Sequence, residues 1–158
     1  MKDDTYFMRE ALKEAEKAYL SDEVPVGAVL VFEQRVIARA HNQVELLKDA
    51  TAHAEMICMG AGAQALDNWR LLETTLYCTI EPCVMCAGGM LLSRIKRLVW
   101  GAKDIRHGAN GSWMDLFARP HPFHRVEITS GILSDECGAI LQNFFRERRE
   151  RKEQGGSD

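Results

Sequence analysis

Residues 51–55 read Thr-Ala-His-Ala-Glu and residues 81–86 read Glu-Pro-Cys-Val-Met-Cys. Cys83 and Cys86 are three residues apart at the start of a predicted helix, so both thiols lie on one helix face. The helix dipole favours the thiolate form there, and the thiolate is the form that binds metal. With His53 they make three ligands, the usual protein share of a catalytic zinc site whose fourth position is left to water. We therefore expect His53, Cys83 and Cys86 to bind one zinc ion per chain.

Glu55 has a different expected role, because a zinc-activated water needs a nearby carboxylate to take its proton and return it. His53 and Glu55 are two residues apart, so they can reach one centre only at the N-terminal end of a helix. Thr51 is the expected cap of that helix. Glu55 is thus the candidate catalytic residue, which would take a proton from the water and pass it to the substrate.

Two other interpretations of the cysteine pair remain open. A structural zinc site would normally use four protein ligands, and the remaining cysteines and histidines offer no fourth with paired spacing. A redox-active Cys-x-x-Cys pair would leave His53 and Glu55 without a role.

Length and composition indicate one soluble globular domain. The chain has 158 residues, of which 46% are hydrophobic and 27% charged. No apolar run is long enough for a membrane span, and the N-terminus lacks a signal-peptide layout, so we expect a cytoplasmic protein. Five cysteines, an odd number, argue against a disulfide framework. The net charge of −3 gives no support for nucleic-acid binding, which would need a local basic patch.

Hydrophobic periodicity predicts alternating helices and strands. Strands separated by helices imply parallel pairs, and hence a mixed α/β sheet of about five strands with helices on both faces. A polar loop is expected over 43–51, and Gly60 and Gly62 weaken the second helix. Residues 1–152 form the expected domain, and 153–158 an expected disordered tail. The expected helices are 4–20, 52–66, 83–92 and 134–152, and the expected strands are 26–32, 36–38, 75–80, 97–100 and 126–129.

Beyond the metal motifs, the sequence resembles the bacterial tRNA-specific adenosine deaminases from about residue 5 to residue 150. His-x-Glu with Pro-Cys-x-x-Cys is the signature of the zinc-dependent nucleobase deaminases. The resemblance implies a cytidine deaminase-like three-layer sandwich, a homodimer, and conversion of adenosine to inosine in the anticodon stem-loop of a tRNA, at the wobble position. The stretches that carry it are 23–29, 40–42, 82–88, 93–95, 101–104, 111–114, 124–126 and 144–149.

The resemblance also implies substrate contacts. Asn42 would hydrogen-bond the flipped base, Asp104 would lie near its ribose, and Arg149 would meet a phosphate. The pocket would be lined by Val26, Leu30 and Phe145, and the backbone at Ala54 and Cys83 would face the base.

Each of these residues also has an ordinary structural explanation. Asn42 and Asp104 can form turns, Val26 and Leu30 can belong to the core, and the arginines near Arg149 can be a solvated helix end.

Two other functions remain open for the same scaffold. A free-base or nucleotide deaminase would share the four site residues but would not need Asp104 or the arginine-rich last helix. An RNA-binding subunit without catalysis would not need Glu55.

Overall fold

The computed structural model describes residues 1–155 and orders ten elements along the chain. Helices and strands alternate as expected, and the sequence order of the predicted elements is confirmed. None of the described helices combines the length and the apolar character that a membrane span requires. The elements are α1 (Asp4–Leu20), β1 (Gly27–Phe32), β2 (Arg35–His41), α2 (Val44–Leu47), α3 (Ala54–Leu66), β3 (Thr74–Ile80), α4 (Val84–Ser93), β4 (Arg97–Ala102), β5 (Glu127–Ser130) and α5 (Ser134–Glu153).

The five strands form one mixed sheet in the order β2-β1-β3-β4-β5. Strand β1 is antiparallel to both β2 and β3, whereas β3, β4 and β5 are parallel. Strands β2, β3, β4 and β5 therefore run in the same direction. Their carboxyl ends meet at one edge of the sheet, where loops and helix N-termini in α/β proteins gather around a ligand.

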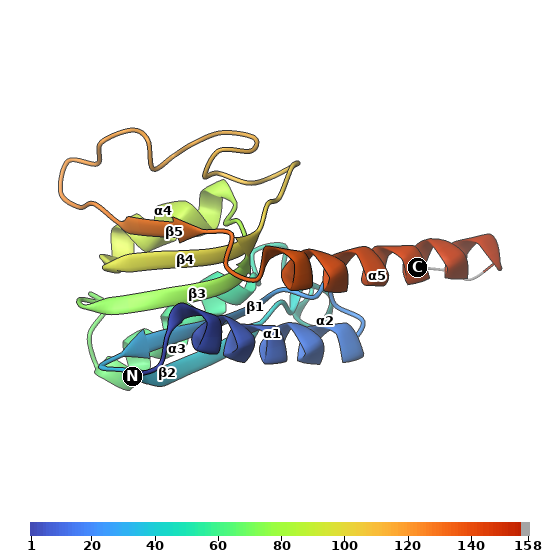
Figure 1. Ribbon diagram of the computed structural model, residues 1–158, viewed down its shortest axis with the longest axis horizontal. Helices are drawn as coiled ribbons and strands as arrows, with labels where there is room; N and C mark the ends of the chain where they lie inside the picture. Colours follow the sequence, from blue (N-terminus) through green and yellow to red (C-terminus); the bar gives the residue numbers. More distant parts are fainter. Residues whose placement is uncertain (156–158) are drawn as a thin grey trace.

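Two hydrophobic cores lie on opposite faces of the sheet. Successive residues of β1 point to opposite faces, so Leu30 packs in the core beneath α3 and α4 while Val29 and Val31 pack beneath α1 and α5. Figure 1 shows the resulting three layers, with α5 extending well beyond the sheet. The predicted architecture, a five-stranded mixed sheet with helices on both faces, is confirmed.

Several element boundaries differ from the prediction. Thr51 does not cap α3; its hydroxyl donates to Asp49 instead, and His53 is the N-cap. The loop at 43–51 contains the short helix α2, which its polar composition concealed. Helix α5 includes Glu153, the first residue of the expected disordered tail. The last three residues of that tail, 156–158, lie outside the described residues.

Gly62 has a packing reason that the sequence did not reveal. A Cβ atom at Gly62 would overlap Cδ2 of Leu30, whereas a Cβ at Gly60 would have no atom of residues 1–155 within 4 Å. Gly62 therefore lets α3 lie close against β1.

Candidate metal centre

The three expected ligands lie at the N-termini of the two helices that cover one face of the sheet. His53 is the N-cap of α3 and Cys83 is the N-cap of α4, with Cys86 in the first turn of α4. Pro82 precedes this cap, and α4 begins at Val84. Among the described residues, neither cap residue forms a side-chain capping hydrogen bond, and Nδ1 of His53 lies beside Sγ of Cys83 instead.

The distances between the ligand atoms fit tetrahedral zinc. Nδ1 of His53 lies 3.5 Å from Sγ of Cys83 and 3.6 Å from Sγ of Cys86. Zn–S bonds of about 2.3 Å and Zn–N bonds of about 2.0–2.1 Å, held at a tetrahedral angle, place S and N about 3.6 Å apart. All three ligand atoms lie within 4.8 Å of one another. The three side chains therefore form a group that could hold one metal ion.

The electrostatics of the cluster suit metal binding and proton transfer. Hydrogen bonding from Cys86, and then from His53, lowers the pKa of Cys83 to about 4 despite partial burial. Glu55 is 3% exposed, and burial raises the pKa of its carboxyl above the ordinary value. A carboxyl with a raised pKa can accept a proton and give it back near neutral pH. Glu55 thus has the environment of a proton carrier.

Asn42 carries an unsatisfied buried atom at the same edge of the sheet. Its side-chain Nδ2 donates to the carbonyl of Val24 at 3.3 Å, which fixes the orientation of the amide. Its Oδ1 is buried and has no hydrogen-bond partner within residues 1–155. Because a buried acceptor without a partner costs about 1–3 kcal/mol, this atom points to a missing donor.

Asp104 follows β4 and does form the turn that its residue type suggested. Its Oδ1 accepts from the backbone N–H groups of Arg106 and His107, both at 3.2 Å. These bonds use one carboxylate oxygen, so Oδ2 can still accept a further hydrogen bond.

The expected pocket residues differ in how accessible they are. Leu30 is fully buried beneath α3, Val26 is 8% exposed and Ala54 is buried at the start of α3. Leu30 therefore belongs to the hydrophobic core.

On α5, Phe145 is 40% exposed and makes an edge contact with the buried ring of Phe144. Arg149 is exposed on the same helix. Neighbouring Arg148 and Arg151 lie close to Asp22, at 3.9 Å and 2.9 Å respectively. Arg149 thus presents its charge to solvent, whereas Asp22 partly neutralises the charges of Arg148 and Arg151.

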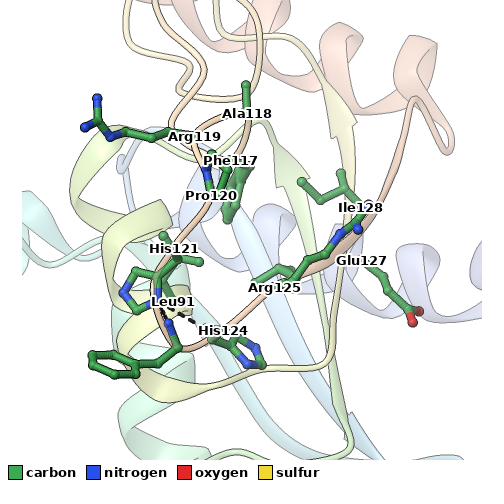
Figure 2. Close-up of a pocket in the computed structure, with 12 residues that line it drawn as sticks. Leu91, Phe117, Ala118, Arg119, Pro120, His121, His124, Arg125, Glu127 and Ile128 are labelled. Atoms are coloured by element: carbon green, nitrogen blue, oxygen red, sulfur yellow. Dashed lines mark hydrogen bonds between the residues drawn. The ribbon is translucent and has the colours of Figure 1, made fainter.

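One cavity lies away from the metal cluster. It has a volume of about 1250 Å³ and is bounded by the segment 117–128 and by Leu91 near the end of α4. Figure 2 shows the side chains of His121 and His124 along this segment, with Arg119 extending outward. None of the three expected metal ligands lines it.

Two buried carboxylates were given no role by the sequence analysis. Glu23 is 2% exposed and accepts from the backbone N–H groups of Glu45 and Leu46 in α2. Glu81 is 1% exposed and accepts from the loop that follows β4. In the sequence, the sign that could have pointed to these two residues was an acidic residue immediately next to a motif. Glu81 also lies at the end of an apolar strand.

Comparison with known proteins identifies the class of this chain. A sequence profile described as the cytidine and deoxycytidylate deaminase zinc-binding region matches residues 1–102. The chain belongs to this family, and it is a deaminase by class.

Comparison with individual proteins shows to which deaminases this chain is similar. A tRNA-specific adenosine deaminase of Bacillus subtilis (strain 168) is 47% identical over 152 residues, covering 96% of this chain and 94% of the relative. A chloroplastic tRNA(adenine(34)) deaminase of Arabidopsis thaliana is 51% identical over 161 residues and covers 92% of this chain. This chain spans 12% of the length of that plant protein.

Solved structures agree with the fold. A structure from studies of A-to-I editing by tRNA:A34 deaminases at the wobble position superposes with a TM-score of 0.83 at 44% identity, covering 87% of this chain and 99% of that chain. A guanine deaminase from Nitrosomonas europaea gives a TM-score of 0.76 at 24% identity, covering 91% and 85% of the two chains. The second match shows that the fold is shared, and it does not select a substrate.

Proposed function

We propose that this chain hydrolytically deaminates adenosine to inosine at the wobble position of a tRNA anticodon. The main structural support for deamination is the buried carboxyl group of Glu55, which lies beside the His53–Cys83–Cys86 cluster. Support for a tRNA substrate comes from a relative that aligns over 94% of its own length and is named as a tRNA-specific adenosine deaminase.

Water replaces the amino group of the base, and ammonia leaves. Zinc held by His53, Cys83 and Cys86 would supply a hydroxide nucleophile near neutral pH, because it lowers the pKa of a bound water. Glu55 takes a proton during the attack and transfers it to the ring nitrogen. The proton of the newly added hydroxyl group then passes through Glu55 to the departing amino group, so that ammonia leaves and the ring carbon keeps the oxygen as a carbonyl. Burial of the carboxyl supports this cycle, because it raises the pKa of Glu55 above its ordinary value.

The base would be held by groups at the helix N-termini. The unpartnered Oδ1 of Asn42 would accept a hydrogen bond from an N–H or O–H of the nucleoside. The backbone at Ala54 and Cys83 would face the base. Val26 would line the pocket, with Leu30 supporting it from the core.

The rest of the RNA chain would contact the loop that follows β4 and helix α5. Asp104 would accept a hydrogen bond from the 2′-hydroxyl through Oδ2, since Oδ1 is engaged in its turn. On α5, Phe145 would contact the nucleotide, and Arg149 would contact a backbone phosphate.

We also propose that the protein acts as a homodimer in the cytoplasm. An apolar groove of about 410 Å³ lies across α3 and α4, lined by residues that include Met56, Met59 and Leu92. Leu92 is 66% exposed and Trp69, at the groove edge, is 55% exposed. Exposed apolar surface of this kind supports association with a second copy. Sedimentation of the protein and of Leu92→Glu tests this, with a dimer and a monomer expected; an unchanged dimer would exclude the groove.

A substrate panel tests the proposed activity. Purified protein is incubated with total tRNA, with free adenosine, with guanine and with cytosine, and the products are separated by mass spectrometry. Inosine released from tRNA after digestion, with no turnover of the free compounds, is the expected result. Turnover of guanine or cytosine without inosine in tRNA would instead establish a free-base deaminase on this scaffold.

A further inference from the structure

Glu81 is a buried carboxylate between the end of β3 and the start of the helix that bears the two cysteines. Four groups donate to it, and all of them come from the loop that follows β4. Its Oε1 accepts from the backbone N–H of Asp104 at 3.2 Å and from the hydroxyl of Ser112 at 2.5 Å. Its Oε2 accepts from the N–H groups of Asn110 at 2.9 Å and Ser112 at 3.2 Å.

These donors explain why a carboxylate is retained at a position that is 1% exposed. Burying a carboxylate is costly unless hydrogen bonds replace its hydration. Hydrogen bonds to an ionised acceptor are roughly twice as strong as neutral ones. The donor residues lie toward the two ends of the nine-residue segment 104–112, with Asp104 at one end and Asn110 and Ser112 toward the other. The carboxylate therefore draws the two ends of this loop segment together around itself.

The same loop is tied to the metal helix by its backbone. The N–H of Ala109 donates to the carbonyl of Pro82 at 2.8 Å, and Gly108 forms a β-bridge with Cys83. A Cβ atom at Gly108 would overlap the carboxylate of Glu81, so the glycine lets the loop backbone pass directly over it. One residue of the loop thus touches both the Glu81 carboxylate and the backbone of a metal ligand.

A second anchor holds the loop to the sheet. The indole Nε1–H of Trp100 donates to Oδ1 of Asn110 at 2.8 Å, and the ring of Trp100 is buried in the core. The position of the loop is therefore set by the sheet through Trp100 and by the metal helix through Glu81.

We propose that Glu81 is a positioning residue for substrate binding. Its carboxylate fixes the loop 104–112 against the N-terminus of α4, so that Asp104 is held at a constant place relative to Cys83. Glu81 acts through that loop and touches neither the ion nor the nucleotide. This inference rests on the proposed function to the extent that the loop forms a wall of the nucleotide site.

Because the metal ligands and Glu55 lie on α3 and α4, loosening the loop should affect substrate binding more than chemistry. The test is Glu81→Gln, which keeps the shape of the side chain but replaces one acceptor oxygen by an N–H donor facing other donors. Zinc content should stay at about one per chain, as for a three-ligand site. The KM for an anticodon stem-loop RNA should rise by about 10- to 100-fold, the range for loss of hydrogen bonds to a charged acceptor, while kcat changes by less than about threefold.

Hydrogen exchange measured by mass spectrometry reads the loop without any substrate. Amides in 104–112 should exchange at least about tenfold faster in Glu81→Gln, in line with lost hydrogen bonds. Ser112→Ala removes one of the four bonds and should give smaller changes in the same direction, and it serves alone if Glu81→Gln does not fold. Glu127→Gln, at an exposed site on β5, is the matched control. It should leave unchanged both the KM for the RNA and the amide exchange rates in 104–112.

Two results would overturn the inference. Unchanged exchange in 104–112 would show that Glu81 does not hold the loop. A loss of zinc and of kcat with KM unchanged would make Glu81 a structural support of the metal helix and not a positioning residue for substrate. If the wild-type protein does not act on RNA, the proposed function fails, but the exchange experiment still decides whether Glu81 fixes the loop.

Discussion

Nδ1 of His53 lies 3.5 Å from Sγ of Cys83, although the two residues are separated by 30 positions in the sequence. The distance matches two ligands on one tetrahedral ion, so removing a ligand should release the metal. Chelator-washed protein should bind about one zinc per chain after reloading, and Cys86→Ser should bind almost none. Elemental analysis by mass spectrometry measures both.

The matched control for this variant is Cys78→Ser. Cys78 is buried in β3, and its thiol donates to the carbonyl of Ile80, a bond that serine can also make. Zinc content should be unchanged in this control. Full zinc content in Cys86→Ser would remove Cys86 from the ligand set.

Asp104→Asn should change the preference between RNA and DNA. Asparagine keeps the Oδ1 acceptor that holds the turn, and it alters the oxygen proposed to accept from the 2′-hydroxyl. The ratio of kcat/KM on a DNA version of the anticodon loop to that on RNA should therefore rise. The measurement is this ratio in the wild-type and variant enzymes. If both substrates are affected equally, Asp104 serves its turn and does not select the ribose.

Two glycines of α3 provide a matched pair for stability. Gly62→Ala should lower the free energy of unfolding by about 1–3 kcal/mol, because the new methyl group overlaps Leu30 in a packed core. Gly60→Ala meets no atom within 4 Å and should raise it by up to about 1 kcal/mol through better helix propensity. Urea denaturation at one fixed protein concentration measures both, and equal effects would contradict the close packing of α3 on β1.

The ion pair between Asp4 and Arg97 should make stability depend on pH. Arg97 donates to both carboxylate oxygens of Asp4, and this hydrogen bonding lowers the pKa of Asp4 below its ordinary value of 3.8. A lowered carboxyl pKa contributes stability above the unfolded-state pKa, and that contribution is lost as the pH falls through the folded-state pKa. Asp4→Asn should therefore cost about 1–2 kcal/mol at pH 7 and much less near pH 2.

Denaturation of both proteins at the two pH values checks the sign of this effect. A difference that stays constant, or grows in acid, would mean that the Asp4 charge contributes nothing through Arg97.

The chemistry of the site could be predicted from the sequence because its residues occur in two short motifs. His53, Cys83 and Cys86 converge because strands of one direction end at one edge of the sheet, which alternating helices and strands already imply. The caps of the two helices could not be predicted in the same way. Thr51 is a good N-cap residue by type, but the helix begins two residues later, where the ligand His53 occupies the cap.

The supporting residues escaped prediction for a different reason. Glu23 and Glu81 bond to backbone N–H groups of segments far along the chain, and backbone donors leave no trace in the identity of the partner residues. Leu30 was expected to line the pocket, but its closeness to Gly62 in α3 places it in the core, and only the packing of α3 on the sheet reveals this.

The central claim is tested most directly by mapping inosine in tRNA treated with the wild-type protein and with Glu55→Gln. Mass spectrometry of anticodon fragments locates the modified nucleoside. Inosine at the wobble position is expected with the wild-type protein. With Glu55→Gln the rate should be at least about 10²–10⁴-fold lower, the range for loss of a positioned acid–base, while zinc content is retained. Inosine formed at a comparable rate by the variant, or absent from the wobble position with the zinc-loaded wild-type protein, would contradict the central claim.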